Sequence, residues 1–245
     1  MTQVRLDKYL SNAGCGTRSE VKQLLKKGLV RVNGEEAKKP EQKVNPGMDE
    51  VCCRGVRILR EEFQYYMLNK PAGYVSATKD PSQPVVLDLI RVPGKEELFP
   101  VGRLDLDTEG LLLLTNDGAL AHELLSPRKH VDKTYFARLD RPADEGDIQR
   151  FQDGLDIGEK KKTLPARLEL GEDGTQVQVT IREGKFHQIK RMFQAVGKQV
   201  MYLKRLSMGS LTLDAGLKPG EWRKLTEQEI EGLRAHVRTK KSSHL

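Results

Sequence analysis

The sequence predicts an α+β fold in two parts. A small N-terminal domain covers residues 1–60, and a larger domain of residues 61–238 is built on a mixed, largely antiparallel sheet. Charge separates the two, because residues 1–60 hold 13 Lys and Arg against 7 Asp and Glu, a surplus of six in a chain whose net charge is +7. In the larger part strand patterns outnumber helical ones and their connections are short. We expect residues 239–245 to be a disordered basic tail.

Composition narrows the class of protein further. Hydrophobic residues make up 37% of the chain and charged residues 31%, and no apolar run approaches the length needed to cross a bilayer. The N-terminus lacks the apolar core of a signal peptide, so we expect a cytoplasmic protein without a membrane partner. The odd set of cysteines, without C-x-x-C spacing, predicts reduced thiols rather than disulfides or zinc. A pI of about 9.2 favours a polyanionic partner.

Two short helices are expected to open the small domain. Apolar residues recur at helical spacing in segment 5–10. A second helix should start at Thr17, whose hydroxyl can accept a hydrogen bond from the Glu20 amide while the Glu20 carboxylate reaches back. This helix should run to Lys27, with Gly28 as a left-handed cap.

A small hairpin sheet should follow these helices. Residues 29–32 form a short apolar strand, and Asn33-Gly34 is a strong hairpin turn. A second strand is expected near residues 50–53, after the Pro46-Gly47 turn. We interpret the next residues as a basic connector to the larger domain, comprising Arg54, Gly55, Arg57 and Arg60.

The larger domain begins with an aromatic and apolar strand from residue 64, followed by a turn at Lys70–Gly73. Four leucines at 111–114 form another apolar run, after which a turn leads into a short helix ending at Leu125. Two further strands are predicted by composition and by alternation with period two, at residues 133–139 and 176–181.

The loop Gly102–Gly110 is the first candidate site. It places one arginine and three carboxylates between two apolar runs, and loops held by a rigid scaffold commonly carry chemistry. Taken alone, a D-x-D loop is more often a polar turn in which a side chain such as that of Asp105 caps a backbone amide.

The second candidate site is segment 183–193, which ends a strand and begins a helix closed by Gly197. Lys190 should flank the apolar stripe of this helix and turn inward, while Arg191 should point to solvent or RNA. Alone, Lys190 is equally a lysine that covers apolar surface with its stem. We interpret His187 as a structural or RNA-contacting residue, and five histidines without H-x-x-x-H spacing argue against a metal site.

Several strings together resemble the pseudouridine synthases that modify ribosomal RNA, and the likeness runs from Arg5 to about Leu233. These are N-K-P-x-G at 69–73, G-R-L-D-x-D-T-x-G at 102–110, K-T-Y at 133–135 and E-G-K-F-H-Q-I-K-R-M at 183–192. The F-H-Q-I-K string is similar to the branch acting on 16S rRNA, with 23S rRNA as the alternative substrate. The first domain resembles the RNA-binding alpha-L motif of a small-subunit ribosomal protein.

The resemblance implies a role for each site residue. Asp105 matches the catalytic aspartate, Lys190 the basic residue that pairs with it, and Tyr135 the tyrosine that stacks on the target base. Without that context, Tyr135 would be packing in a half-buried strand. Arg103 would fill or brace the space left by the flipped nucleotide, and no metal or cofactor is needed.

The RNA-binding residues are predicted from charge as well as resemblance, since phosphate contacts dominate RNA affinity. Cations on or near the first two helices would bind phosphate, although each would also suit a solvated helix face. With the two residues of the second site, the predicted set is Arg5, Lys8, Arg18, Lys22, Lys26, His187 and Arg191.

Pseudouridine formation breaks the bond between ribose C1′ and uracil N1 and rejoins the ring through C5. An ionised Asp105 can attack C1′ as a nucleophile or remove a proton from C2′, and the sequence leaves both open. The expected substrate is 16S rRNA, free or in a partly assembled small subunit, bound by a monomer. One alternative function is a non-catalytic ribosome assembly factor, but such a protein should have lost Asp105 or Lys190, and both are present. Another is a metal-dependent transferase that uses the D-x-D string as a metal site, but the sequence offers no other metal ligands.

Overall fold

The computed structural model describes residues 3–46, 48–58 and 63–239. The chain divides into two compact units, one formed by Met1–Gln64 with Ile90–Leu98 and the other by Tyr65–Leu89 with Phe99–Leu245. The basic tail expected at 239–245 lies outside the described residues except for Thr239, which is the last residue of a helix.

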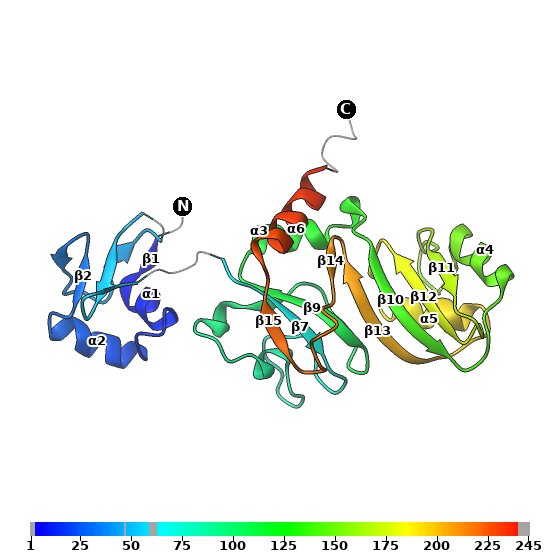
Figure 1. The fold of residues 1–245 in the computed structure, drawn as a ribbon, viewed down its shortest axis with the longest axis horizontal. Helices are drawn as coiled ribbons and strands as arrows, with labels where there is room; N and C mark the ends of the chain where they lie inside the picture. The colour runs from blue at the N-terminus through cyan, green and yellow to red at the C-terminus, as the bar shows by residue number, and fades with distance from the viewer. Residues whose placement is uncertain (1–2, 47, 59–62, 240–245) are drawn as a thin grey trace. The chain divides into compact units, whose positions relative to one another are not determined.

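The first unit opens with helices α1 (Leu6–Asn12) and α2 (Arg18–Lys26), both as predicted (Figure 1). Thr17 caps α2, because its hydroxyl accepts from the Glu20 amide and the Glu20 carboxylate accepts from the Thr17 amide. Gly28 follows at φ +67°, the left-handed conformation that ends the helix. The apolar faces of both helices pack into one small core with the sheet strands.

A four-stranded sheet in the order β3-β2-β5-β6 completes this unit. Asn33 and Gly34 both have positive φ, as the predicted hairpin turn requires. The expected basic connector is wrong in part, because Arg54 and Gly55 form a second tight turn of the same kind. Arg60 and Gly47 lie outside the described residues. The strands are β2 (Val30–Val32), β3 (Glu35–Glu36), β5 (Val51–Cys53) and β6 (Val56–Arg57), with a separate pair β1 (Val4–Arg5) and β4 (Lys43–Val44).

The second unit is built on a nine-stranded sheet ordered β11-β12-β10-β13-β9-β7-β15, with β14 on β13 and β8 on β9 (Figure 1). Among its described strands only β9 and β13 run parallel, which confirms the largely antiparallel prediction. The strands are β7 (Tyr65–Lys70), β8 (Phe99–Pro100), β9 (Glu109–Thr115), β10 (Lys133–Leu139), β11 (Arg167–Leu170), β12 (Gln176–Ile181), β13 (Val200–Met208), β14 (Leu211–Thr212) and β15 (Trp222–Lys224).

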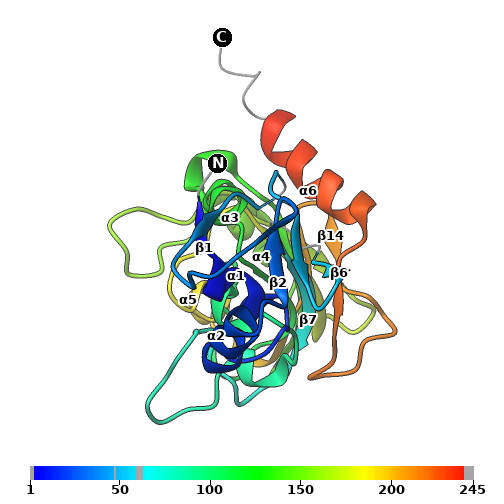
Figure 2. The same ribbon diagram turned by 90° about the vertical axis from the view of Figure 1, so that its left-hand side faces the viewer.

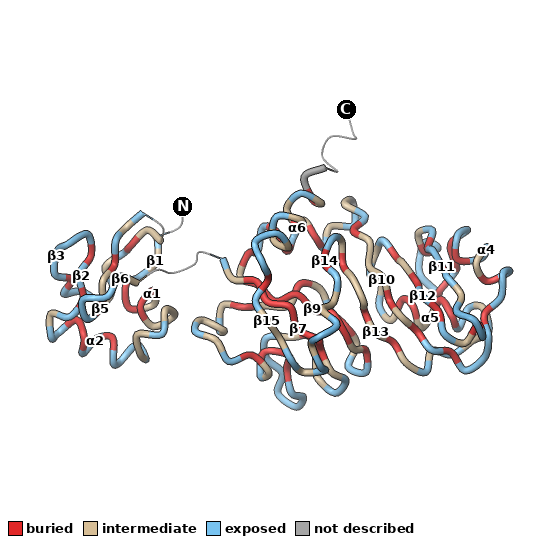
Figure 3. The backbone as a smooth tube through the Cα atoms, in the orientation of Figure 1, coloured by how far each residue is buried: buried red, intermediate tan, exposed pale blue. Residues whose placement is uncertain are grey.

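Helices flank this sheet. They are α3 (Gly118–Leu125), α4 (Glu145–Asp153), α5 (Gln188–Ala195) and α6 (Glu227–Thr239), with 3₁₀ turns η1 (Val86–Leu89), η2 (Lys95–Glu97) and η3 (Pro127–Lys129). α6 packs beside α3 and β14 (Figure 2). Every residue of β7 is buried, as are six of the seven residues of β9, so these two strands run through the interior (Figure 3). Because both strands are held in the interior, the end of β7 and the start of β9 have defined positions, and the site is built there.

Candidate active site

Residues 102–108 of the predicted site at 102–110 form a loop that joins β8 to β9. Lys70 supports this loop from the protein interior. Lys70 ends β7 and is completely buried. Its ammonium donates to the carbonyl oxygens of Asp105 at 3.0 Å and Thr108 at 2.8 Å. It also donates to those of Pro71 at 3.0 Å and Leu106 at 3.3 Å. A buried cation therefore gathers the backbone carbonyls of the loop.

Burial lowers the pKa of Lys70 to about 8, although the negative charges of Asp107, Glu109 and Asp105 partly oppose the shift. The sequence indicated only a turn at this position. A lysine in an otherwise apolar strand was the available signal, since a buried charge needs partners or a function.

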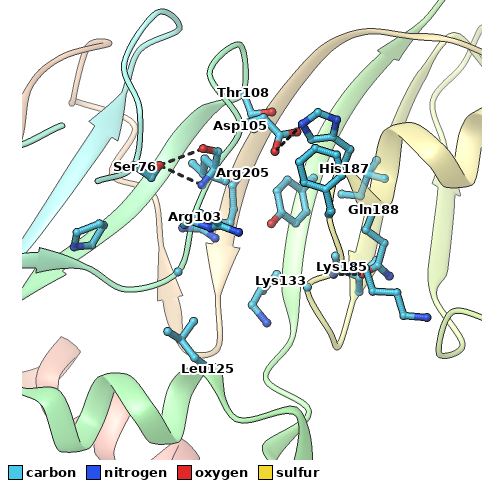
Figure 4. Close-up of a pocket in the computed structure, with 18 of the residues that line it drawn as sticks. Ser76, Arg103, Asp105, Thr108, Leu125, Lys133, Lys185, His187, Gln188 and Arg205 are labelled. Atoms are coloured by element: carbon cyan, nitrogen blue, oxygen red, sulfur yellow. Dashed lines mark hydrogen bonds and ion pairs between the residues drawn. The ribbon is translucent and has the colours of Figure 1, made fainter. Parts of the chain in front are cut away.

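Two further contacts fix the same loop. The Ser76 hydroxyl donates to the Leu104 carbonyl at 3.1 Å and accepts from the Leu104 amide at 3.0 Å (Figure 4). The Gly73 amide donates to the Leu106 carbonyl at 2.8 Å. Asp105 thus lies between two anchored neighbours, and its carboxylate projects from a fixed backbone.

Helix α5 brings Lys190 to this carboxylate, on the side of the helix that its phase predicts. The Lys190 ammonium lies 3.3 Å from Asp105 Oδ2 and 2.6 Å from Asp107 Oδ1. Burial raises the pKa of Asp107, but the hydrogen bond and charge of Lys190 outweigh it, so that this pKa lies below its usual range. The Asp105 side chain is 26% exposed and that of Asp107 71%. Asp105 is therefore the carboxylate that faces the pocket, and Asp107 secures the lysine from outside.

His187 lies on the other side of the same carboxylate. Its Nε2 is 3.6 Å from Asp105 Oδ1, and its backbone has φ +47° immediately before α5. Non-glycine residues seldom adopt this left-handed conformation, which here turns the imidazole toward the loop. The predicted structural or RNA-contacting histidine therefore lies in direct reach of the reacting region.

A pocket of about 1020 Å³ opens in front of Asp105 and is lined by Arg103, Tyr135, His187 and Lys190 (Figure 4). Tyr135 is 7% exposed and comes from β10, whereas Arg103 is exposed. This volume is large enough to hold a ligand such as a nucleoside. The structure thus brings the three predicted catalytic residues and Arg103 to one pocket.

Arg205 and Lys133 also line this pocket, and neither was predicted as a site residue. Arg205, on β13 opposite Tyr135, is 2% exposed. Its Nε donates to the Leu111 carbonyl at 2.7 Å, and its Nη2 has no hydrogen-bond partner among the described residues. Burial, and to a smaller extent the charge of Arg205, lower the pKa of Lys133 to about 8. The pocket floor therefore carries two cations, which suits a guest that gains negative charge.

Arg191, which is expected to meet solvent or RNA, has protein partners in the structure and a side chain that is 25% exposed, and its contact with RNA stays a prediction. Its guanidinium donates to Glu159 Oε1 at 2.8 Å, to the Phe186 carbonyl at 3.1 Å and, closely, to the Ile157 carbonyl. The helix phase placed Arg191 correctly off the apolar stripe, but the loop at 157–159 folds over it. Helical periodicity contains no information about such a distant loop.

The cations of the first unit fall into two groups. Arg18, Lys22 and Lys26 are exposed at four-residue spacing along α2, as an RNA-binding face requires. Arg5 instead precedes α1 and makes two hydrogen bonds to Asp7. Lys8 pairs with Glu97 at 3.0 Å. Arg5 and Lys8 are therefore each paired with a carboxylate, and their predicted contact with RNA phosphate stays a prediction.

Within residues 3–46, 48–58 and 63–239, no three His, Cys, Asp or Glu side chains are grouped to hold a metal ion. Over the same part of the chain, no helix has the length and apolar character needed to cross a membrane.

Two family models match the chain, one near its start and one in its larger part. An S4 domain model covers residues 4–51, and an RNA pseudouridylate synthase model covers residues 64–195. A crystal structure titled pseudouridylate synthase superimposes with a TM-score of 0.67 at 39% identity, covering 94% of this chain and 99% of that one. The fold and the site together define an RNA-modifying enzyme with an added S4 domain.

Relatives are similar over nearly their whole length. An uncharacterized RNA pseudouridine synthase of Bacillus subtilis is 49% identical, with 93% of this chain and 97% of the relative covered. The ribosomal small subunit pseudouridine synthase A of Escherichia coli is 42% identical, with coverages of 93% and 98%. The chain belongs to the RNA pseudouridine synthase family, whose members isomerise uridine in RNA.

Proposed function

We propose that this protein converts a uridine of small-subunit ribosomal RNA to pseudouridine. The observation that carries the proposal is the position of Asp105, a half-buried carboxylate in a nucleoside-sized pocket that contacts Lys190 at 3.3 Å. The small-subunit substrate is supported by the 42% identity to the Escherichia coli enzyme of that name. The exposed cations of α2 supply a surface for RNA phosphates.

The reaction begins with a uridine that leaves its stack and enters the pocket. Asp105 then either attacks C1′ with a carboxylate oxygen or removes the C2′ proton, and in both routes the C1′–N1 bond breaks and its electrons leave with the uracil. The uracil turns and C5 bonds to C1′. In the first route this breaks the ester bond between Asp105 and C1′, and in the second Asp105 returns the proton to C2′. The C5 proton is then released. Both routes need a negative Asp105, and Lys190 stabilises that charge by its proximity.

The remaining pocket residues act on the base and the RNA. Tyr135 offers its ring as a stacking surface while the uracil turns, and its burial keeps that ring in one orientation. Arg103, exposed at the mouth, braces the space that the uridine leaves. The detached uracil carries negative charge, which the cations Arg205 and Lys133 on the pocket floor stabilise.

We also propose where the enzyme acts, in which oligomeric state and on which form of the substrate. The enzyme acts in the cytoplasm as a monomer, on 16S rRNA that is free or in a partly assembled small subunit. The reaction neither oxidises nor reduces the base, and we propose that it proceeds with no metal or cofactor. The S4 match at residues 4–51 supports a first unit that binds RNA.

The test is incubation of the purified protein with 16S rRNA, 23S rRNA and partly assembled small subunits, in buffer with a metal chelator. Pseudouridine is then mapped at single-base resolution. One modified site in 16S rRNA or its particle is the expected result. A site in 23S rRNA alone would overturn the substrate, and tight binding without product on any RNA would favour a ribosome assembly factor.

A further inference from the structure

Phe186 is a large apolar side chain that the reaction does not use. It is 68% exposed, yet it lines the pocket beside His187 and therefore lies at the pocket rim. Its ring is stacked on the imidazole, with centroids 3.8 Å apart and planes inclined by 19°. One face of Phe186 is thus covered by His187, and most of the remaining ring is open to solvent.

The position of this pair is tied to the catalytic loop, because His187 Nε2 lies 3.6 Å from Asp105. The turn that carries the pair is also fixed. The Lys185 ammonium donates to the carbonyls of Lys161 at 2.8 Å and Lys162 at 3.0 Å. The exposure of Phe186 therefore belongs to an anchored turn beside the carboxylate.

Charge around the ring indicates what it contacts. Arg103, Lys185 and Lys190 line the same pocket, so the apolar ring shares the pocket with three cations. A protein partner with an apolar patch would gain nothing from these charges. An aromatic ring flanked by cations is the usual combination for unpaired RNA, whose bases stack while its phosphates are neutralised.

We propose that Phe186, backed by His187, is a stacking platform for the unpaired base next to the target uridine. This inference rests on the proposed function, since the flanking nucleotide reaches the rim only when the uridine is in the pocket. The adjacent nucleotide is covalently joined to the target, so its base must lie within one nucleotide step of Asp105. Phe186 is the exposed ring at that place.

Stacking has a consequence for substrate choice. Every base offers an aromatic face, so the platform tolerates any base at the flanking position but requires that base to be unpaired. The enzyme then selects a structural context in the RNA, and the pocket selects the uridine. A duplex flank would hide the face that Phe186 contacts.

The test is a cycle of protein variants and RNAs that carry the target. Phe186→Ala, Phe186→Leu and Phe186→Trp are compared with Met201→Ala, a matched control that removes another exposed apolar side chain, 60% exposed, on β13. Each binds the native RNA and RNAs with an abasic site on the 5′ or the 3′ side of the uridine. Thermal unfolding confirms that all variants fold.

We expect Phe186→Ala to bind native RNA roughly 5- to 150-fold more weakly, the equivalent of about 1–3 kcal/mol for one stacked base. Phe186→Leu should lose most of this affinity and Phe186→Trp little, while Met201→Ala should match wild type. Wild type should bind one of the two abasic RNAs more weakly than native RNA by a similar factor. Phe186→Ala should bind that abasic RNA no more weakly than wild type does.

The proposal is overturned if Phe186→Ala binds RNA as tightly as wild type does, or if Phe186→Leu and Phe186→Trp have the same affinity. It is also overturned if, for both abasic RNAs, the affinity lost through Phe186→Ala adds fully to the affinity lost through the abasic site. Pseudouridine mapping of wild type on the native RNA separates this from the proposed function. Failure of that mapping rejects the activity, whereas failure of the cycle with product present rejects only the platform.

Discussion

The Lys70 ammonium lies 3.0 Å from the backbone carbonyl oxygen of Asp105, so a buried cation supports the same residue that presents its carboxylate to the pocket. Lys190 contacts that carboxylate from the opposite side. One lysine therefore positions the backbone and the other positions the side chain. Because the two belong to β7 and α5, the geometry of Asp105 depends on the folded sheet rather than on the loop alone.

The first prediction concerns this support. Lys70→Met removes a donor to four carbonyl oxygens, and each buried acceptor left without a partner costs about 1–3 kcal/mol. We expect the single-turnover rate at saturating RNA to fall at least 100-fold, because displacing a catalytic carboxylate by about 1 Å lowers the rate by that order. RNA affinity should change little.

Lys79→Met is the matched control, since Lys79 is exposed on the same unit. It should keep both rate and affinity. If Lys70→Met folds and retains a rate within tenfold of wild type, the loop does not depend on the ammonium and its role is confined to stability.

The second prediction separates the two aspartates. Asp105→Asn keeps the shape of the side chain but can neither attack C1′ nor accept a proton, so product should disappear while RNA still binds. Asp107→Asn should be milder, because Asp107 is 71% exposed and contacts Lys190 from outside the pocket. Both are measured as single-turnover rates and as RNA affinities. Equal losses would show that the carboxylates act as one unit, and residual turnover of Asp105→Asn within tenfold would remove its assignment.

The third prediction compares neighbours of equal charge on α5. Lys190→Met removes the cation 3.3 Å from Asp105, and it should depress the chemical step, measured as the single-turnover rate at saturating RNA. Arg191→Met breaks contacts to the 157–159 loop, so it should lower stability and leave the saturated rate nearly unchanged. The reverse pattern in rates would refute the assignment of Lys190.

Local signals predicted much of the fold because they act over a few residues. The capping box at Thr17 and the alternating strand at 176–181 both appear where the sequence placed them. The strand from residue 64 was correct in kind and ends at Lys70, before the turn. These elements are specified by hydrogen bonds and periodicity that the segment itself contains.

Local sequence patterns predict less wherever a residue that is distant in the chain decides the structure. Strand β13 was not predicted, because Arg205 occupies a buried position where alternation calls for an apolar residue. The Arg54-Gly55 turn was taken for a connector, since arginine rarely adopts positive φ. Arg191 and Lys8 are predicted to bind RNA, and their carboxylate partners Glu159 and Glu97, far away in sequence, could not be predicted from the local pattern.

The fourth prediction concerns the first unit. Replacing Arg18, Lys22 and Lys26 together with glutamine removes the exposed cations of α2. Each lost phosphate contact should reduce the slope of log K against log salt by about 0.7–0.9, so the triple variant should flatten that slope by roughly 2. The charge-matched control replaces Lys38, Lys39 and Lys43, which are also exposed but lie outside α2. Equal slopes for both triple variants would mean that only total charge matters.

The last prediction uses the pocket lysine whose pKa is lowered. Burial and the neighbouring Arg205 lower the pKa of Lys133 from 10.5 to about 8 in the folded protein. Between these two values the unfolded chain binds a proton that the folded protein has released, so this lysine makes stability rise with pH over that range. Well below pH 8 the folded protein carries the full cost of the buried charge.

Lys133→Met removes that contribution. We expect the variant to be more stable relative to wild type at pH 7.5 than at pH 10, with the gap in free energy of unfolding shrinking steadily between them. Denaturant unfolding at pH 7.5, 8.5, 9.5 and 10 measures the gap, and other titrating groups cancel because both proteins share them. Lys79→Met, which changes an exposed lysine, should show a constant gap. A constant gap for Lys133→Met as well would mean that its ammonium is not destabilised by Arg205 and burial.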